Sequence, residues 1–151
     1  MKNSLISSGK VIALYLSIKD KTGRISQEKV AVDKNGIIGD KFYGKDPQRS
    51  ILLTSVESYE MAEQGKIIIA YGSLGENILI DYNPYLLDPG STLTLGDVVL
   101  EISQNCTTCK SLTKIDSKLP KLLRNDRGVF VKVLKGGTIS VDDAIRIDTK
   151  S

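Results

Sequence analysis

The stretch that decides the fold class is Leu93-Thr94-Leu95-Gly96-Asp97-Val98-Val99-Leu100-Glu101-Ile102, where a glycine and an aspartate separate two short apolar runs. Runs of this length with alternating or β-branched residues are typical of β-strands. Similar runs recur along the chain, and we also expect strands at Val11–Leu16, Lys29–Val32, Ser50–Leu53, Asn77–Ile80, Val129–Val133 and Ala144–Ile147. About eight short strands, with no regular alternation of strand and helix, predict a mainly β fold that forms a barrel or a sandwich.

Helical signals are few. Ser55 is placed to cap a helix over Val56–Gln64 that Gly65 ends, and Leu119–Leu123 is expected to form a short basic helix. Turns are indicated at Asn35-Gly36, Asp88-Pro89-Gly90 and Gly136-Gly137. The expected architecture is therefore a β-rich barrel with a few short helices.

The composition is that of a soluble globular protein, with 40% hydrophobic and 26% charged residues. A length of 151 residues suits a single domain, which we expect to span residues 1–151. No window approaches the roughly 20 apolar residues of a bilayer span, and the first residues lack the apolar core of a secretory signal. We therefore expect a cytoplasmic protein without membrane segments. The net charge of +3 is too small to indicate nucleic-acid binding.

The segment Cys106-Thr107-Thr108-Cys109 contains the only two cysteines of the chain, which also has no histidine. Because cytosolic cysteines stay reduced, a structural disulfide is not expected, and a reactive or metal-binding pair becomes the alternative. A closed zinc site would need two carboxylates or a dimer interface, since the chain offers neither a second cysteine pair nor a histidine. A dithiol of the thioredoxin kind begins a helix in a βαβ unit, whereas this pair follows a strand.

The two cysteines could also be small buried side chains, which is a common role for this residue. Their polar neighbours argue against burial; these neighbours are Asn105, Thr107, Thr108, Lys110 and Ser111. The charge of Lys110 would favour the thiolate form of a neighbouring cysteine.

Basic residues are concentrated in the segment that follows the cysteines in the sequence. From Lys110 to Lys135 there are eight lysines and arginines against two acidic residues, while the rest of the chain has a slight acidic excess. A solvated helix face is one interpretation of this stretch. The other is an anion site beside the cysteines, suited to a phosphorylated cofactor.

Several segments, taken in order, resemble the MOSC domain, a module found at the C-terminal end of molybdenum-cofactor sulfurases, in mitochondrial amidoxime-reducing enzymes and in short stand-alone bacterial proteins. The resemblance runs from roughly Gly9 to Ile147 and rests on the order and spacing of the segments together. The segments are Gly36-Ile37-Ile38-Gly39-Asp40-Lys41, Gln48-Arg49-Ser50-Ile51-Leu52-Leu53 with Glu57-Ser58, Gly75-Glu76-Asn77-Ile78, Gly90-Ser91-Thr92-Leu93-Thr94-Leu95-Gly96 and Arg127-Gly128-Val129-Phe130-Val131-Lys132-Val133-Leu134-Lys135-Gly136-Gly137.

This resemblance implies that a cysteine after the central strand binds molybdenum or carries transferable sulfur. The run Cys109-Lys110-Ser111-Leu112-Thr113-Lys114-Ile115-Asp116 is similar to the corresponding segment of the amidoxime-reducing enzymes, with a one-residue difference in spacing. Many stand-alone bacterial members carry two cysteines close together at this place, as this chain does. We therefore take Cys109 as the catalytic thiol and metal ligand, and Cys106 as the second thiol.

Two positions depart from the family pattern. Phe42-Tyr43 stands where stand-alone members often have a histidine, so no proton-transfer role is assigned there. Asp142-Asp143 stands where the family usually shows Gly-Asp, and we expect this change to alter only a turn.

The implied cofactor is the molybdenum cofactor (molybdopterin), whose soft, sulfur-rich metal suits a protein thiolate as an additional ligand. The same thiolate could instead hold a persulfide. The candidates for binding the cofactor's phosphate are the cations Arg49, Lys110, Arg124 and Arg127. Asn77 is expected either to hydrogen-bond the pterin or to satisfy the backbone of a turn. Asp40 is expected either to contact the cofactor or to cap a strand end.

The sequence leads to three functional hypotheses. The first is a carrier that delivers molybdenum cofactor or sulfur to another protein, with a sulfur donor or acceptor protein as its partner. The second is a small molybdoenzyme that reduces N-hydroxylated substrates with electrons from a separate reductase, because the chain has no flavin, haem or iron–sulfur motif. The third is a thiol redox protein that uses Cys106 and Cys109.

Overall fold

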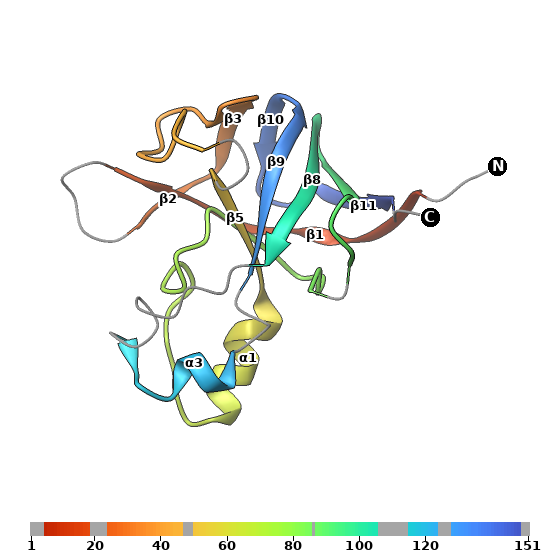
Figure 1. The fold of residues 1–151 in the computed structure, drawn as a ribbon. Helices are drawn as coiled ribbons and strands as arrows, with labels where there is room; N and C mark the ends of the chain where they lie inside the picture. Colours follow the sequence, from red (N-terminus) through yellow and green to blue (C-terminus); the bar gives the residue numbers. More distant parts are fainter. Residues whose placement is uncertain are drawn as a thin grey trace.

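A computed structural model of the chain describes residues 5–18, 24–46, 50–85, 87–105, 115–123 and 128–148. A closed β-barrel of 7 strands forms the centre of the molecule (Figure 1). In their order around the barrel the strands are β1 (Leu5–Ser17), β11 (Ala144–Asp148), β7 (Thr92–Leu95), β8 (Val98–Asn105), β9 (Val129–Lys135), β5 (Ile51–Ser55) and β6 (Ile78–Ile80). The mainly β, barrel-like fold predicted from the sequence is confirmed.

The long strand β1 closes the barrel because it pairs with different neighbours along its length. Its first half pairs with β11, its middle pairs with β6, and its end forms a hairpin with β2 (Arg24–Gln27). Neighbouring strands run antiparallel apart from β5 and β6, which are parallel and are joined through α1 (Val56–Gln64). The parallel pair places the N-terminal ends of β5 and β6 side by side.

A second, smaller sheet has the order β10-β3-β4. Its strands are β3 (Lys29–Asp33), β4 (Gly36–Ile37) and β10 (Gly137–Ser140). The predicted turn at Asn35-Gly36 joins β3 to β4, and the backbone N–H of Asn35 donates to Asp33 Oδ1 at 2.8 Å. Every strand expected from the sequence is present. The strands β2, β4 and β10 were not expected, because each contains a single isoleucine among polar or glycine residues and so shows no apolar pattern.

Aliphatic side chains fill the barrel and alternate with outward-facing ones along the strands, as in β11, where Ile145 and Ile147 are buried between exposed neighbours. Every residue of β5 is buried, so its outer face is covered as well as its inner one. The interior side chains include Val11, Leu14, Ile51, Leu53, Ile78, Leu93, Leu100, Val129 and Val131.

The described residues contain two helices, α1 and α3 (Leu119–Leu122), which lie together outside one end of the barrel (Figure 1). Their apolar side chains form a second cluster with Leu79 of β6. The bounds predicted for α1 are confirmed, since the Ser55 hydroxyl accepts a hydrogen bond from Glu57 N at 3.1 Å and Gly65 ends the helix. The helix α3 ends one residue earlier than predicted. Among all the described residues, no helix is long and apolar enough to cross a membrane.

Candidate functional site

Two of the predicted site residues, Asp40 and Asn77, lie in the described part of the chain. The other predicted site residues lie outside the described residues: Cys106, Cys109, Arg49, Lys110, Arg124 and Arg127. The described residues that flank their segments are Ser50, Asn105, Ile115, Leu123 and Gly128. The site is therefore built from Asp40, Asn77 and these flanking residues.

Asp40 and Asn77 contact each other, because Asn77 Nδ2 donates a hydrogen bond to Asp40 Oδ1 at 3.1 Å. The same carboxylate accepts hydrogen bonds from the backbone N–H of Ser17 at 2.7 Å and of Phe42 at 3.1 Å. Asp40 is 5% exposed. It therefore links the end of β1 to the loop after β4, which is the strand-end role expected for it, while its contact with a cofactor stays a prediction.

Asn77 holds the start of β5 against β6. Its Oδ1 accepts from Leu52 N at 3.1 Å, and its backbone N–H donates to Leu52 O at 2.9 Å. Its Nδ2 donates to Tyr15 O at 3.3 Å as well as to Asp40. Both N–H bonds of this amide are thus engaged with protein acceptors. The pterin contact expected for Asn77 stays a prediction.

The strand register aligns the end of β8 with the start of β6. A single row of paired residues crosses four neighbouring strands; it consists of Asn105, Val129, Leu53 and Ile78. Asn77 directly precedes Ile78, which is one end of this row. Asn105 is the other end, three strand spacings of ~4.8 Å or about 14 Å away. Cys106 directly follows Asn105 in the chain, and Arg127 comes two residues before Val129. The segments that carry these two residues therefore join the barrel at adjacent points.

A buried carboxylate directly precedes Asn77. Glu76 is 0% exposed, and its two oxygens accept hydrogen bonds from the Tyr59 hydroxyl at 2.8 and 2.7 Å. The backbone N–H of Gly72 donates to Glu76 Oε2 at 3.0 Å. Sequence reasoning did not assign a role to Glu76, although a charged residue beside the apolar run of β6 was a visible signal.

The charge of Glu76 affects the tyrosines around it. Burial first, and then the Glu76 charge, raise the pKa of Tyr59 well above its ordinary value. Burial followed by the charges of Glu76 and Tyr71 also raises the pKa of Tyr15. Tyr71 packs edge-on against Tyr59 with ring centroids 5.0 Å apart. With raised pKa values, Tyr15 and Tyr59 stay protonated at neutral pH and cannot serve as general bases.

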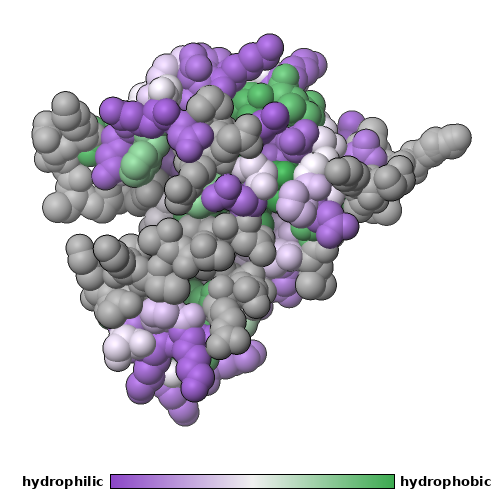
Figure 2. Space-filling view, viewed as in Figure 1, coloured by the Kyte–Doolittle hydropathy of each residue, from purple (hydrophilic) through white to green (hydrophobic). Residues whose placement is uncertain are grey.

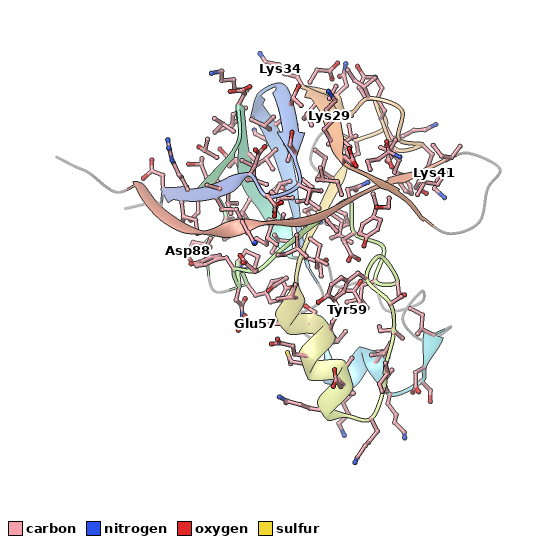
Figure 3. The ribbon with its side chains drawn as sticks, turned by 180° about the vertical axis from the view of Figure 1, so that it is seen from behind. Lys29, Lys34, Lys41, Glu57, Tyr59 and Asp88 are labelled. Carbon is pink, nitrogen blue, oxygen red and sulfur yellow. The ribbon has the colours of Figure 1, made fainter. Side chains whose placement is uncertain are left out.

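Figure 2 shows the described surface on this side as largely hydrophilic, with a hydrophobic patch near the turn between β9 and β10. Lys41, labelled in Figure 3, lies at the end of β1, where its backbone N–H donates to Ser17 O at 2.7 Å. Its exposed ammonium lies 5.0 Å from the centre of the Phe42 ring. Lys41 is a cation that the sequence reasoning did not consider. The described residues contain no group of three or more histidine, cysteine, aspartate or glutamate side chains placed to hold a metal ion.

Comparison with protein-family models matches the MOSC domain to residues 39–146. This chain belongs to the MOSC domain family. The matched span of the MOSC domain includes Asp40, Asn77 and both cysteines. The resemblance of the sequence segments to this family is confirmed.

Solved structures share the fold of this MOSC domain. The YuaD protein from Bacillus subtilis aligns with a TM-score of 0.85 at 18% identity, covering 97% of this chain and 98% of that chain. YiiM from Escherichia coli aligns with a TM-score of 0.69 at 20% identity, covering 94% of this chain and 71% of that chain. YiiM from Geobacillus stearothermophilus aligns with a TM-score of 0.66 at 19% identity, over 95% and 74% of the two chains. Comparison with curated protein sequences gives no match.

The two departures from the MOSC pattern have local structural consequences. Tyr43, in the place where a histidine is common, donates its hydroxyl to Asp33 Oδ2 at 2.5 Å, and this hydrogen bond raises its pKa. Asp142, in the place of the usual glycine, has a φ of 77°, which is the left-handed conformation that glycine adopts freely. Asp143 N donates to Ser140 O at 3.1 Å in the same turn. The second departure thus lies in a turn, as expected.

Proposed function

We propose that this MOSC domain is a carrier that holds molybdenum cofactor, or sulfur taken from a donor protein, through the thiolate of Cys109. Cys106 acts as the second thiol of the pair. The carrier works in the cytoplasm, where both thiols stay reduced. Its partners are the proteins that supply and receive the cofactor or the sulfur.

The observation that carries this proposal is the pairing of Asn105 with Val129. It brings the end of the strand that precedes the two cysteines next to the start of the strand that follows Arg127. A thiol segment and a cationic segment that join the barrel at adjacent points support a site that combines a soft ligand with phosphate binding.

The chemistry of the donor set fits the cofactor. A thiolate is a suitable ligand for molybdenum, and guanidinium groups bind phosphate through two hydrogen bonds. We assign the phosphate to Arg49, Lys110, Arg124 and Arg127. Molybdenum, when bound, supplies redox chemistry at the metal. The protein supplies the thiolate and the cations.

The test is elemental analysis of protein purified from a host that makes molybdenum cofactor. We expect molybdenum with pterin, or persulfide sulfur, in the unmodified protein. The variant Cys109→Ser should lose it, and Cys106→Ser should lose it only in part. Circular dichroism of each variant controls for folding. Full metal and sulfur content in a folded Cys109→Ser variant contradicts the proposal.

A further inference from the structure

We infer that the segment 67–70 is an interaction surface that pairs, as an antiparallel β-strand, with the same segment of a second copy of this chain. The segment has the sequence Ile-Ile-Ile-Ala and leads from the end of α1 back toward the barrel. Figure 1 shows it running without a turn. Its pairing is independent of the cofactor binding proposed above.

The side chains of this segment alternate between the protein interior and the solvent, as they do along a β-strand. Ile67 is buried in the second apolar cluster, and Ile69 packs against the same cluster. Ile68, between them, is 85% exposed, more than any other large hydrophobic side chain among the described residues. Two isoleucines thus fix the segment to the protein, while the third is presented to the solvent.

The backbone of the segment has one edge that faces α1 and one that faces away from it. The N–H of Ile67 donates to Ala62 O at 2.9 Å, so its edge is the one that faces α1. Because the backbone groups of successive residues in a strand point to opposite edges, the N–H and C=O of Ile68 point away from α1. In the part of the chain that the structure describes, neither group of Ile68 has a hydrogen-bond partner. A second extended backbone can bind both groups at once.

This edge lacks the features that usually keep strand edges from pairing. Exposed edges in natural proteins are protected by lysine, by proline or by a bulge. The segment instead has three consecutive isoleucines, a residue type that favours strands, and neither a charge nor a proline follows before Tyr71. An apolar edge without such protection indicates a surface that a partner covers.

The partner that fits this edge is a second copy of the chain. In an antiparallel pair centred on Ile68, the N–H of each Ile68 donates to the Ile68 carbonyl of the other copy. The two exposed isoleucine side chains then lie on the same face of the pair and cover each other. Such a contact uses the same surface on both copies, so it closes after two of them.

The charge of Lys66 favours the antiparallel direction. Lys66 is exposed and directly precedes the segment. Parallel pairing in register would place the two Lys66 residues side by side, which is unfavourable. Antiparallel pairing about Ile68 separates them by four residues of strand, or about 14 Å, which exceeds the ~8 Å Debye length at physiological salt. Because the paired edge is short, we expect the dimer to be weak.

The test is sedimentation velocity of the full chain over about 5–500 µM. A thiol reductant is present throughout, so that the cysteines cannot join two copies. We expect monomer at the lowest concentration and mostly dimer at the highest. Ile68→Lys places two like charges opposite each other at the centre of the pair and should raise the Kd of the dimer by about tenfold or more. The substituted side chain is exposed, so circular dichroism should be unchanged.

The matched control is Ile38→Lys. It makes the same change of charge at another exposed isoleucine, which is 51% exposed and directly follows β4. It should leave the Kd of the dimer unchanged within about twofold. Amide hydrogen exchange reports the strand pairing itself: at the highest concentration, exchange of the Ile68 N–H should slow more than that of Ile69, because only the Ile68 N–H points at the partner.

Three results would overturn the pairing of this segment. The first is a monomer at every concentration. The second is a dimer that Ile68→Lys does not weaken, or that Ile38→Lys weakens equally. The third is a dimer in which the exchange of the Ile68 N–H does not slow.

Discussion

The hydroxyl of Tyr59 donates to both oxygens of the Glu76 carboxylate, at 2.8 and 2.7 Å. The same hydroxyl accepts hydrogen bonds from the backbone N–H of Gly72 at 2.9 Å and of Leu74 at 3.2 Å. One phenol thus joins α1 to the loop that leads into β6. Figure 3 shows Tyr59 on the side of α1 opposite Glu57. Since Glu76 directly precedes Asn77 in the chain, the contact between Tyr59 and Glu76 also helps to hold Asn77 of the candidate site in place.

Replacing Tyr59 with phenylalanine should destabilise the protein. The substitution removes a donor from a fully buried carboxylate and leaves two backbone N–H groups with one acceptor fewer. Each buried polar group that loses its partner costs about 1–3 kcal/mol, so we expect the free energy of unfolding to fall by at least about 2 kcal/mol. The free energy of unfolding is measured by urea denaturation. Tyr71→Phe is the control, because Tyr71 is half exposed, and its change should stay within about 0.5 kcal/mol. Equal losses in the two variants would contradict the role of this hydroxyl.

Stability should fall in alkaline solution, and Tyr59 should account for part of the fall. The pKa of Tyr59 is raised in the folded protein above its ordinary value of 10.0, by burial and then by Glu76. The folded protein therefore keeps this proton over a pH range in which the unfolded chain loses it. The corresponding stability is complete below pH 10 and decreases as the pH rises above that value.

This pH dependence can be measured as the urea midpoint between pH 8 and pH 11, in steps. The unmodified protein should lose stability more steeply above pH 10 than Tyr59→Phe does. A remaining slope in the variant is expected from Tyr15 and Tyr43, whose pKa values are also raised. Identical slopes in the two proteins would contradict the assignment of this pH dependence to Tyr59.

Replacing Gly136 with alanine should force β3 away from the turn between β9 and β10. A Cβ atom at this position would lie 2.5 Å from the carbonyl oxygen of Val32 and 3.0 Å from the Cα of Asp33, and both are backbone atoms that cannot rotate away. We expect a loss of about 2–3 kcal/mol in the free energy of unfolding. Gly44→Ala is the comparison, since no atom lies within 4 Å of its added methyl group and only its φ of +75° opposes the change. Its cost should be about 1 kcal/mol. If Gly136→Ala lowers the free energy of unfolding no more than Gly44→Ala does, the close contact with Val32 does not form and the prediction is wrong.

Neutralising Arg127 should weaken cofactor binding without affecting stability. If Arg127 binds the phosphate, Arg127→Gln should lower the binding free energy by about 1.5–3 kcal/mol, the contribution of a charge-assisted hydrogen bond. Arg124→Gln should behave in the same way. Lys121→Gln removes the same charge from an exposed position on α3 and should change neither binding nor stability by more than about 0.5 kcal/mol. Equal affinities in all three variants would leave the basic stretch as a solvated surface.

Local patterns in the sequence were sufficient for most of the secondary structure. The helix α1 was predicted with its bounds because its cap at Ser55 and its end at Gly65 depend on hydrogen bonds between residues close in the chain. The barrel strands were predictable because an alternation of buried and exposed residues, or in β5 and β6 a short, mostly apolar run, is visible within five or so residues. The strands β2, β4 and β10 were missed because they are paired by neighbours that other parts of the fold supply.

By itself, the sequence determined the chemistry available to the protein: two thiols, no histidine, a basic stretch and the ordered segments of a MOSC domain. Which residues meet was decided by the tertiary structure. Asp40 and Asn77 are 37 residues apart, and Tyr59 and Glu76 are 17 apart. Side-chain hydrogen bonds across such separations depend on strand order, register and the closure of β1 on β11, and no local pattern encodes these. For this reason the residue types of the candidate site could be named in advance, but the buried contacts of Asp40 and Asn77 with β1 and β5 could not.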